Sequence, residues 1–111
     1  MVDRRRTPRY AVIWREGQGT LRAGRLELTA DVLRIEGSSR DGSFSRCEVP
    51  LTAIRAVRIG RMRNERVEGM PSLIVERVYG EPLLVADATG TGAVHELADA
   101  LTLGLQSTHP A

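Results

Sequence analysis

Apolar and polar residues alternate along most of this chain, and the alternation is clearest between Gly24 and Gly37. There, in the stretch GRLELTADVLRIEG, leucine and isoleucine alternate with charged residues on both sides of a short Ala30-Asp31 turn. A period of two places successive side chains on opposite faces of a strand. The stretch therefore predicts a hairpin of two strands, each with one buried face.

The same alternation, interrupted by turn-forming residues, predicts five further strands. Gly24 lies inside one of the strands and predicts a bulge or a bend there. Short strands separated by turns, with no helix between them, are typical of a sandwich or a partly open barrel. The seven predicted strands span residues 9–15, 20–29, 32–36, 44–49, 54–60, 72–79 and 82–87.

One helix is predicted after the strands. Apolar residues recur at steps of three and four from Val94 to Leu105, and Thr91 is the expected N-cap. We therefore expect a mainly β fold: a seven-stranded antiparallel sandwich or partly open barrel, capped at one open end by this C-terminal helix. The expected core contains Leu26, Leu28, Leu33, Ile35, Val57, Ile59, Leu97 and Leu101.

The length of 111 residues fits a single domain. We expect residues 1–8 to form a basic flexible arm, 9–105 to form the β-domain with its helix, and 106–111 to form a frayed tail. No run of residues is apolar enough for a membrane span or a signal peptide, and one cysteine cannot form an internal disulfide. These features predict a cytoplasmic protein.

The positive charge of the chain is concentrated in two stretches. Residues 1–9 carry a net +3 and residues 55–66 a net +4, so the rest of the chain carries −5 although the whole carries +2. Such asymmetry favours contact with an anionic ligand or surface. The candidate anion-binding residues are Arg5, Arg6, Arg9, Arg55, Arg58, Arg61 and Arg63.

The hairpin predicted at 72–87 differs from the others because both of its faces are apolar. A strand pair of this kind needs cover on both sides. The core can cover one side, and a helix, a loop or a second subunit must cover the other. Self-association is therefore a hypothesis, with candidate contact residues Leu73, Ile74, Val78 and Leu84.

Seven strands, one closing helix and the GRLELT-x-DVLRIEG hairpin followed by VPLTAIRAVRI resemble the pleckstrin-homology-like (PH-like) superfold, in particular its GRAM and bacterial PH-like branches. The resemblance covers roughly residues 19–105. It implies the fold and little about function, because superfolds host many activities. Eukaryotic relatives bind phosphoinositides through a basic early loop, whereas Arg40 is the one basic residue of the corresponding loops here. The matching positions are Gly24, Leu26, Leu28, Thr29, Asp31, Leu33, Leu51, Ile54 and Val57.

A second resemblance lies at the N-terminus. The stretch RRRTPRYAV is similar to the opening of PilZ domains, which bind cyclic di-GMP with an R-x-x-x-R arm and a downstream [DN]-x-S-x-x-G strand. Arg5 and Arg9 match the arm. The downstream match is Gly37-x-Ser39-x-x-Gly42, in which glycine stands in the place of Asp or Asn.

Several kinds of chemistry find no support in the sequence. The stretch ADATGTGAVHEL resembles a phosphate-binding turn, but too few residues follow it to complete a βαβ unit, so we interpret it as a loop and helix cap. Cys47 lies on a core face, and neither His95 nor His109 is placed to join it in a zinc site. Carboxylates are not paired for acid–base catalysis. We expect no enzyme, no metal, no cofactor and no nucleic acid binding.

The function expected from the sequence is that of a non-catalytic binding or assembly module of the bacterial cytoplasm. Its partner would be another protein or a second copy of the chain in a homodimer. One alternative is a PilZ-like regulator that responds to cyclic di-GMP through Arg5 and Arg9. Another alternative is weak electrostatic attachment to an anionic membrane surface.

Overall fold

The computed structural model describes residues 9–88 and 93–108. Within these ranges the predicted mainly β fold is confirmed, with seven antiparallel strands and one C-terminal helix. The proposed arm at 1–8 and the proposed N-cap Thr91 lie outside the described residues. The elements are β1 (Arg9–Glu16), β2 (Arg22–Leu28), β3 (Val32–Ser38), β4 (Phe44–Pro50), β5 (Ile54–Gly60), β6 (Ser72–Arg77), β7 (Leu83–Asp87), α1 (Ala93–Thr108), and two short 3₁₀ turns, η1 (Leu51–Ala53) and η2 (Arg63–Glu65).

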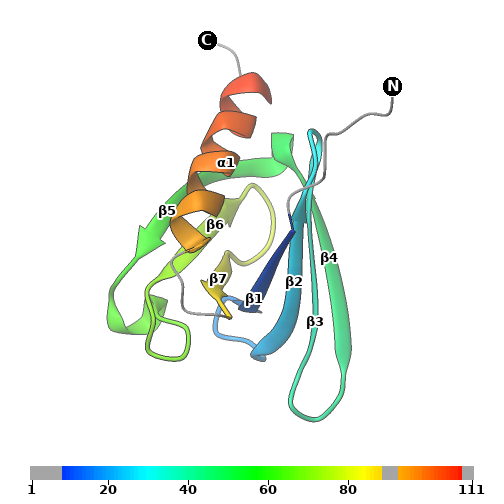
Figure 1. The fold of residues 1–111 in the computed structure, drawn as a ribbon, viewed down its shortest axis with the longest axis vertical. Coiled ribbons are helices and arrows are strands. Elements are labelled where there is room, and N and C mark those ends of the chain that lie inside the picture. Colours follow the sequence, from blue (N-terminus) through cyan, green and yellow to red (C-terminus); the bar gives the residue numbers. More distant parts are fainter. Residues whose placement is uncertain (1–8, 89–92, 109–111) are drawn as a thin grey trace.

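The seven strands form one antiparallel sheet in the order β4-β3-β2-β1-β7-β6-β5. Figure 1 shows the sheet curled into a half-barrel, with β1–β4 on one side, β5–β7 on the other, and α1 across one end. The helix packs on η1, β5, β6 and β7. It runs to Thr108, three residues beyond the predicted boundary, because Pro110 is the first residue there that strongly opposes a helix.

The main core fills the inside of the half-barrel. Strand residues from both sides of the curl meet there with Val94, Leu97 and Leu101 of α1. Six of the eight predicted core residues are buried, while Val57 and Ile59 are half-buried and pack against the same cluster. The last two lie on β5, which pairs with β6 alone among the described strands. The core prediction is therefore confirmed, with this difference at the sheet edge.

The Trp14 side chain extends from β1 through the interior of the half-barrel to β3. It is the largest fully buried side chain. Its indole Nε1 donates a hydrogen bond of 3.0 Å to the carbonyl oxygen of Glu36. The ring lies against Gly37, where a Cβ atom would approach Nε1 to 2.8 Å. Position 37 is therefore glycine because a side chain there would collide with the tryptophan, and not because the chain turns there.

A second, smaller cluster lies on the outer face of the sheet. Ile74 and Leu84, each 3% exposed, pack there under the loop between η2 and β6, which contributes Val67 and Met70. This loop is the second cover that the two-faced hairpin requires. Leu73 faces the main core and is fully buried. The expected self-association surface is therefore wrong for Leu73, Ile74 and Leu84, and of the four candidates only Val78 is exposed.

Gly24 does not form the predicted bulge. The β2–β3 ladder is regular through this position, with Gly24 directly opposite Gly37. A Cβ atom on Gly24 would stand 2.0 Å from the carbonyl oxygen of Glu36. The glycine therefore permits a close approach of two strands, and the irregularity of the sheet lies instead in β5, between Ile54 and Ala56.

Candidate functional site

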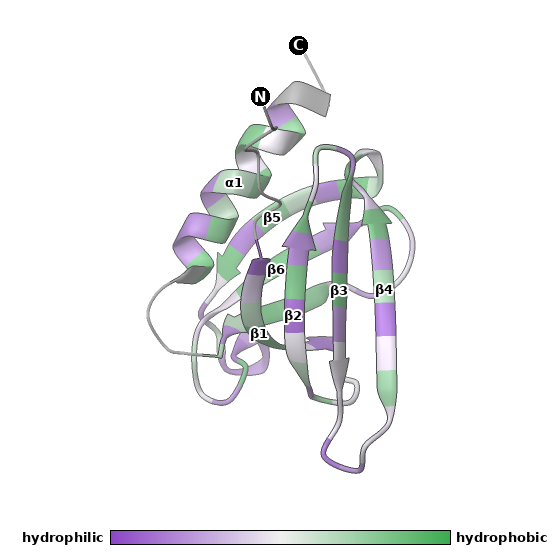
Figure 2. Cartoon of the chain, turned by 45° about the vertical axis from the view of Figure 1, so that its right-hand side comes forward, coloured by the Kyte–Doolittle hydropathy of each residue, from purple (hydrophilic) through white to green (hydrophobic). Residues whose placement is uncertain are grey.

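Most arginines of β1–β4 are engaged in ion pairs on the outer face of the sheet. Figure 2 shows hydrophilic and hydrophobic residues alternating along β2, β3 and β4. One row of directly opposed residues runs across the four strands from Arg9 through Glu27 and Arg34 to Glu48. The nearest nitrogen–oxygen distances are 2.9 Å for Arg9–Glu27, 3.5 Å for Arg34–Glu27 and 2.9 Å for Arg34–Glu48.

A second row lies two residues further along the strands. Arg25 and Arg46 flank Glu36, with nitrogen–oxygen distances of 3.2 and 3.4 Å. Opposite charges directly across neighbouring strands stabilise their pairing. The charges on this face are therefore used within the sheet, and Arg9 in particular is bound to Glu27 rather than free for a ligand.

The predicted basic patch at 55–66 is likewise partly paired. Arg58 lies 2.9 Å from Glu65 and 3.2 Å from Glu76, and its guanidinium holds the pKa of the Glu65 carboxyl below its usual range. Arg55, Arg61 and Arg63 are exposed, and their side chains contact no hydrogen-bonding or charged partner in the described part of the chain. The patch thus contains three free cations, spread over β5 and the following loop.

The residues of the PilZ-like resemblance do not come together among those described. Arg5 and Arg6 lie outside the described residues. Arg9 stands in the charge row that crosses β3 at Arg34, and Ser39 lies five residues further along, about 16 Å away along the strand direction. Gly37 is covered by the Trp14 ring. We therefore find no convergence of Arg9 with the Gly37–Gly42 segment.

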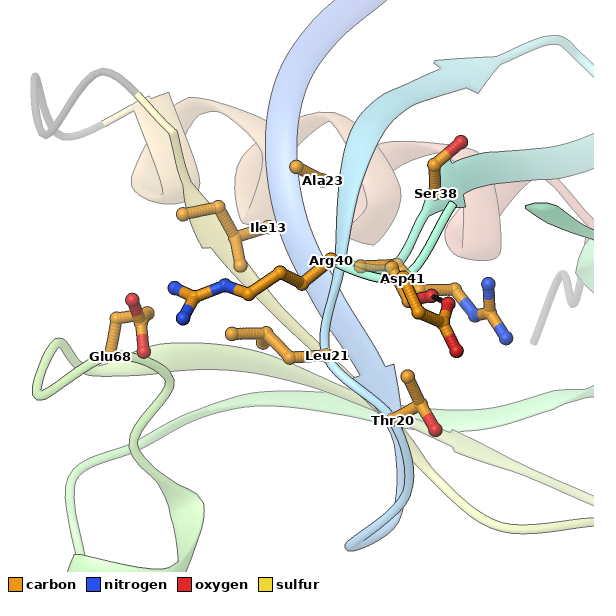
Figure 3. Close-up of a pocket in the computed structure, with 10 residues that line it drawn as sticks. Ile13, Thr20, Leu21, Ala23, Ser38, Arg40, Asp41 and Glu68 are labelled. Atoms are coloured by element: carbon orange, nitrogen blue, oxygen red, sulfur yellow. Dashed lines mark hydrogen bonds between the residues drawn. The ribbon is translucent and has the colours of Figure 1, made fainter. Parts of the chain in front are cut away.

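A hollow on the outer face of the sheet is the candidate site. Its volume is about 690 Å³, and it lies beside the smaller hydrophobic cluster, between the β1–β2 connection, the β3–β4 loop and the loop that carries Glu68. Figure 3 shows Ile13, Leu21 and Ala23 at its base and Arg40 extended over them toward Glu68. The lining residues are Ile13, Thr20, Leu21, Arg22, Ala23, Ser38, Ser39, Arg40, Asp41 and Glu68.

The β3–β4 loop holds its position through its own hydrogen bonds. The backbone N–H of Ser39 donates to the carbonyl of Ser43 at 2.8 Å, and that carbonyl also accepts from Arg22 Nη1 at 2.8 Å. Hydrogen bonds from the Ser39 hydroxyl, and next from the Ser43 N–H, hold the pKa of the Asp41 carboxyl below its usual range. The loop therefore presents Arg40 from a fixed base.

Arg40 and Glu68 are the two free charges of the hollow. Arg22 and Asp41 already make the hydrogen bonds just described, whereas Arg40 and Glu68 make no hydrogen bond or ion pair within residues 9–88 and 93–108. Both side chains are exposed. A ligand that enters the hollow thus meets an apolar base with one unpaired cation and one unpaired anion on its rim.

The backbone at Glu68 is strained. Val67 and Met70 exchange two backbone hydrogen bonds of 2.9 Å around Glu68 and Gly69, whose φ angles are 52° and 77°. Two successive positive φ angles are typical of a type I′ turn, in which Asn-Gly is favoured. Glu68 is the one residue other than glycine with positive φ in the described ranges. Strained residues of this kind cluster at functional sites.

Replacing Glu68 with asparagine is expected to stabilise the fold. Asparagine tolerates the left-handed conformation better than glutamate, so Glu68→Asn should raise the free energy of unfolding by about 0.5–1 kcal/mol. Urea denaturation followed by circular dichroism measures this difference. A loss of stability on this substitution would mean that the glutamate side chain has a structural partner, which would contradict its description as a free charge.

The described residues include one thiol, that of Cys47. Burial, as the largest effect, raises the pKa of the Cys47 thiol, whose sulfur accepts a hydrogen bond of 3.4 Å from Arg77. A thiol held neutral is a poor nucleophile. No group of three His, Cys, Asp or Glu residues in the described ranges could hold a metal ion. No described helix is long and apolar enough to cross a membrane.

Comparisons with known proteins show the fold and leave the function open. No protein-family model and no curated protein match this sequence. Three chains among the solved structures match. One is the crystal structure of the C-terminal domain of an unknown protein from Leishmania infantum, with a TM-score of 0.62 and 13% sequence identity over 88% of this chain and 81% of that one. At this identity the likeness extends to the fold alone.

Sequence reasoning did not find the hollow. Its lining comes from three connections that are distant in sequence, and their meeting depends on the curl of the sheet. One local signal was available, because Glu68-Gly69 occupies the centre of a tight turn where Asn-Gly would be expected. Arg40 was noticed only as the one basic residue of its loop.

Proposed function

We propose that this chain is a PH-like, non-catalytic binding module of the bacterial cytoplasm, and that its outer-face hollow binds an extended peptide segment of another protein. The observation that carries the proposal is the Arg40 side chain, which extends over the apolar residues of the hollow toward Glu68 while neither charge makes an ion pair or hydrogen bond in the described part of the chain. The strand order and the helix across one end of the curl support the PH-like assignment.

The size and shape of the hollow favour a peptide over a small ion. A simple anion needs converging cations, yet Arg22 is engaged by the Ser43 carbonyl and Arg40 stands opposite an acidic residue. The hollow is open and of the volume that drug-sized ligands occupy. An extended peptide brings an apolar side chain together with polar groups on both sides of it.

The expected peptide therefore has a defined chemistry. An apolar side chain would lie on Ile13, Leu21 and Ala23, and burying it supplies most of the binding energy. An acidic residue on one side would form a bidentate pair with the Arg40 guanidinium. A basic residue of the peptide would pair with Glu68.

The test begins with a library of random heptapeptides displayed on phage and selected on the immobilised protein. Selected peptides are then measured by fluorescence anisotropy against the unmodified protein and against Arg40→Glu. We expect Arg40→Glu to weaken binding at least tenfold, since it replaces an attractive charge with a repulsive one. Ala23→Phe, which fills the hollow from an exposed position, should weaken binding similarly.

The matched control is Arg55→Glu, which makes the same change of charge at an exposed arginine of β5 outside the hollow. It should leave the affinity within about twofold, because exposed charges away from a site act weakly through screened electrostatics. If all selected peptides bound Arg40→Glu and Ala23→Phe as tightly as the unmodified protein, the hollow would not be the binding site.

A further inference from the structure

We propose that the free edge of β4 pairs with β4 of a second copy, so that two half-barrels share one continuous antiparallel sheet. Strand β4 is hydrogen-bonded to β3 on one side and to no described strand on the other. Figure 1 shows it as the outermost strand of its half of the sheet. An unpaired strand edge is a template for pairing with another chain.

Two hydrogen bonds at the ends of the β3–β4 ladder show which backbone groups of β4 face outward. The N–H of Ser39 donates to the carbonyl of Ser43, and the N–H of Leu51 donates to the carbonyl of Asp31. In an antiparallel ladder, bonded and non-bonded pairs alternate. Cys47 therefore bonds to Ile35, while Arg46 and Glu48 direct their N–H and C=O groups to the free edge.

A two-fold axis at Cys47 gives the favourable register. It places Arg46 of one copy opposite Glu48 of the other, twice, with both side chains on the outer face. An axis at Arg46 would place that arginine opposite itself, and an axis at Glu48 would place that glutamate opposite itself. Like charges directly opposite one another destabilise a sheet, whereas opposite charges stabilise it. Outward hydrogen bonding is compatible with each of these three axes, and charge favours the axis at Cys47.

This register also continues the charge rows of the outer face. The row that ends at Glu48 in one copy is followed by Arg46, Glu36 and Arg25 of the second copy, so the signs alternate across the junction. Phe44, 56% exposed, would lie opposite Pro50. Pro50 has no N–H, so its place on a free edge leaves no donor unsatisfied there. The symmetric junction would contain about six backbone hydrogen bonds.

Mixing two charge-reversal variants tests the pairing directly. Arg46→Glu and Glu48→Arg each place like charges opposite one another in a self-paired dimer, whereas a mixed dimer of the two has glutamate opposite arginine at both contacts. Sedimentation equilibrium should show dimer for the unmodified protein at about 100 µM, corresponding to a modest affinity. Each variant alone should associate at least tenfold more weakly, and the equimolar mixture should return to dimer.

The matched control is Arg55→Glu, the same charge change on the exposed edge strand at the other end of the sheet. It should dimerise like the unmodified protein. Circular dichroism verifies that both β4 variants remain folded. An unmodified protein that stays monomeric at this concentration, a mixture no more associated than its components, or dimers lost in the Arg55→Glu control would each overturn the proposal.

Oxidative cross-linking tests the register independently. With the axis at Cys47, the two Cys47 residues form a non-bonded antiparallel pair with Cα atoms about 4.5 Å apart, which is within disulfide range. Copper-phenanthroline oxidation should therefore yield a covalent dimer that reductant reverses. The double variant Cys47→Ser/Ser45→Cys moves the thiol two residues along β4 and should not cross-link. Equal cross-linking of the two proteins, or none in either, would overturn the register.

Discussion

Replacing Trp14 with alanine is expected to lower the free energy of unfolding by about 3–5 kcal/mol. Trp14 is 1% exposed and is the largest side chain buried inside the half-barrel, so its removal leaves a cavity that the curled sheet cannot close. Domains of this size are stable by roughly 5–15 kcal/mol in total. The variant should therefore be close to unfolding at room temperature.

The comparison with Trp14→Phe separates volume from hydrogen bonding. Phenylalanine fills part of the same space but removes the indole donor to the Glu36 carbonyl, and losing one hydrogen bond of this kind costs about 0.5–1.5 kcal/mol. Because Trp14 is the one tryptophan of the chain, unfolding should be followed by far-ultraviolet circular dichroism rather than by intrinsic fluorescence. A loss below about 1 kcal/mol in Trp14→Ala would contradict the described core.

Leu97→Ala is expected to cost about 2–5 kcal/mol of unfolding free energy. Leu97 is 1% exposed and is part of the apolar face with which α1 packs on the core. The helix packs on β5–β7 at one end of the half-barrel, so detaching it exposes the buried residues of these strands to water. Chemical denaturation measures the difference, with the slope of the transition showing whether the helix detaches separately.

Leu103 provides the matched control on the same helix. It is 66% exposed, so Leu103→Ala removes the same atoms from a position that makes little contact with the core. Its effect should lie within about 0.5 kcal/mol of zero. Equal effects of the two substitutions would mean that α1 does not dock through Leu97, and the description of one shared core would then be wrong.

The sequence predicts the strands and the helix well because their signals are local. Alternation in the Gly24–Gly37 stretch and the three- and four-residue steps after Val94 each follow from the geometry of one element. The inner positions of β2 and β3 are therefore also the core positions found in the structure. Fold class and most of the core were accessible in this way.

Features that depend on contacts between distant segments were not accessible. Ile74 and Leu84 look like an open face until the loop with Val67 and Met70 is placed over them. Arg9 and Arg58 look like free cations until strand register brings Glu27 and Glu76 beside them. Neither the cover nor the pairing has a periodic signal in the sequence.

The candidate site was also missed because it depends on contacts between distant segments. Arg40 and Glu68 are 28 positions apart in the sequence, and nothing near either of them shows that they will flank one hollow. Their significance comes from lying unpaired at one hollow, beside Arg22 and Asp41, which are engaged in hydrogen bonds, and this is a property of the folded chain. The β4 edge is similar, because its charges become complementary only in a given register.

Chemical-shift mapping tests the central claim, that a peptide binds in the outer-face hollow, most directly. The ¹⁵N-labelled protein is titrated with a selected heptapeptide while backbone amide shifts are recorded. The account predicts that the largest changes fall on Leu21, Ala23, Ser39, Arg40 and Glu68, with the amides of β5 and α1 little changed. Changes concentrated on β5, on α1 or on the Arg55–Arg63 stretch, with the hollow unaffected, would contradict it.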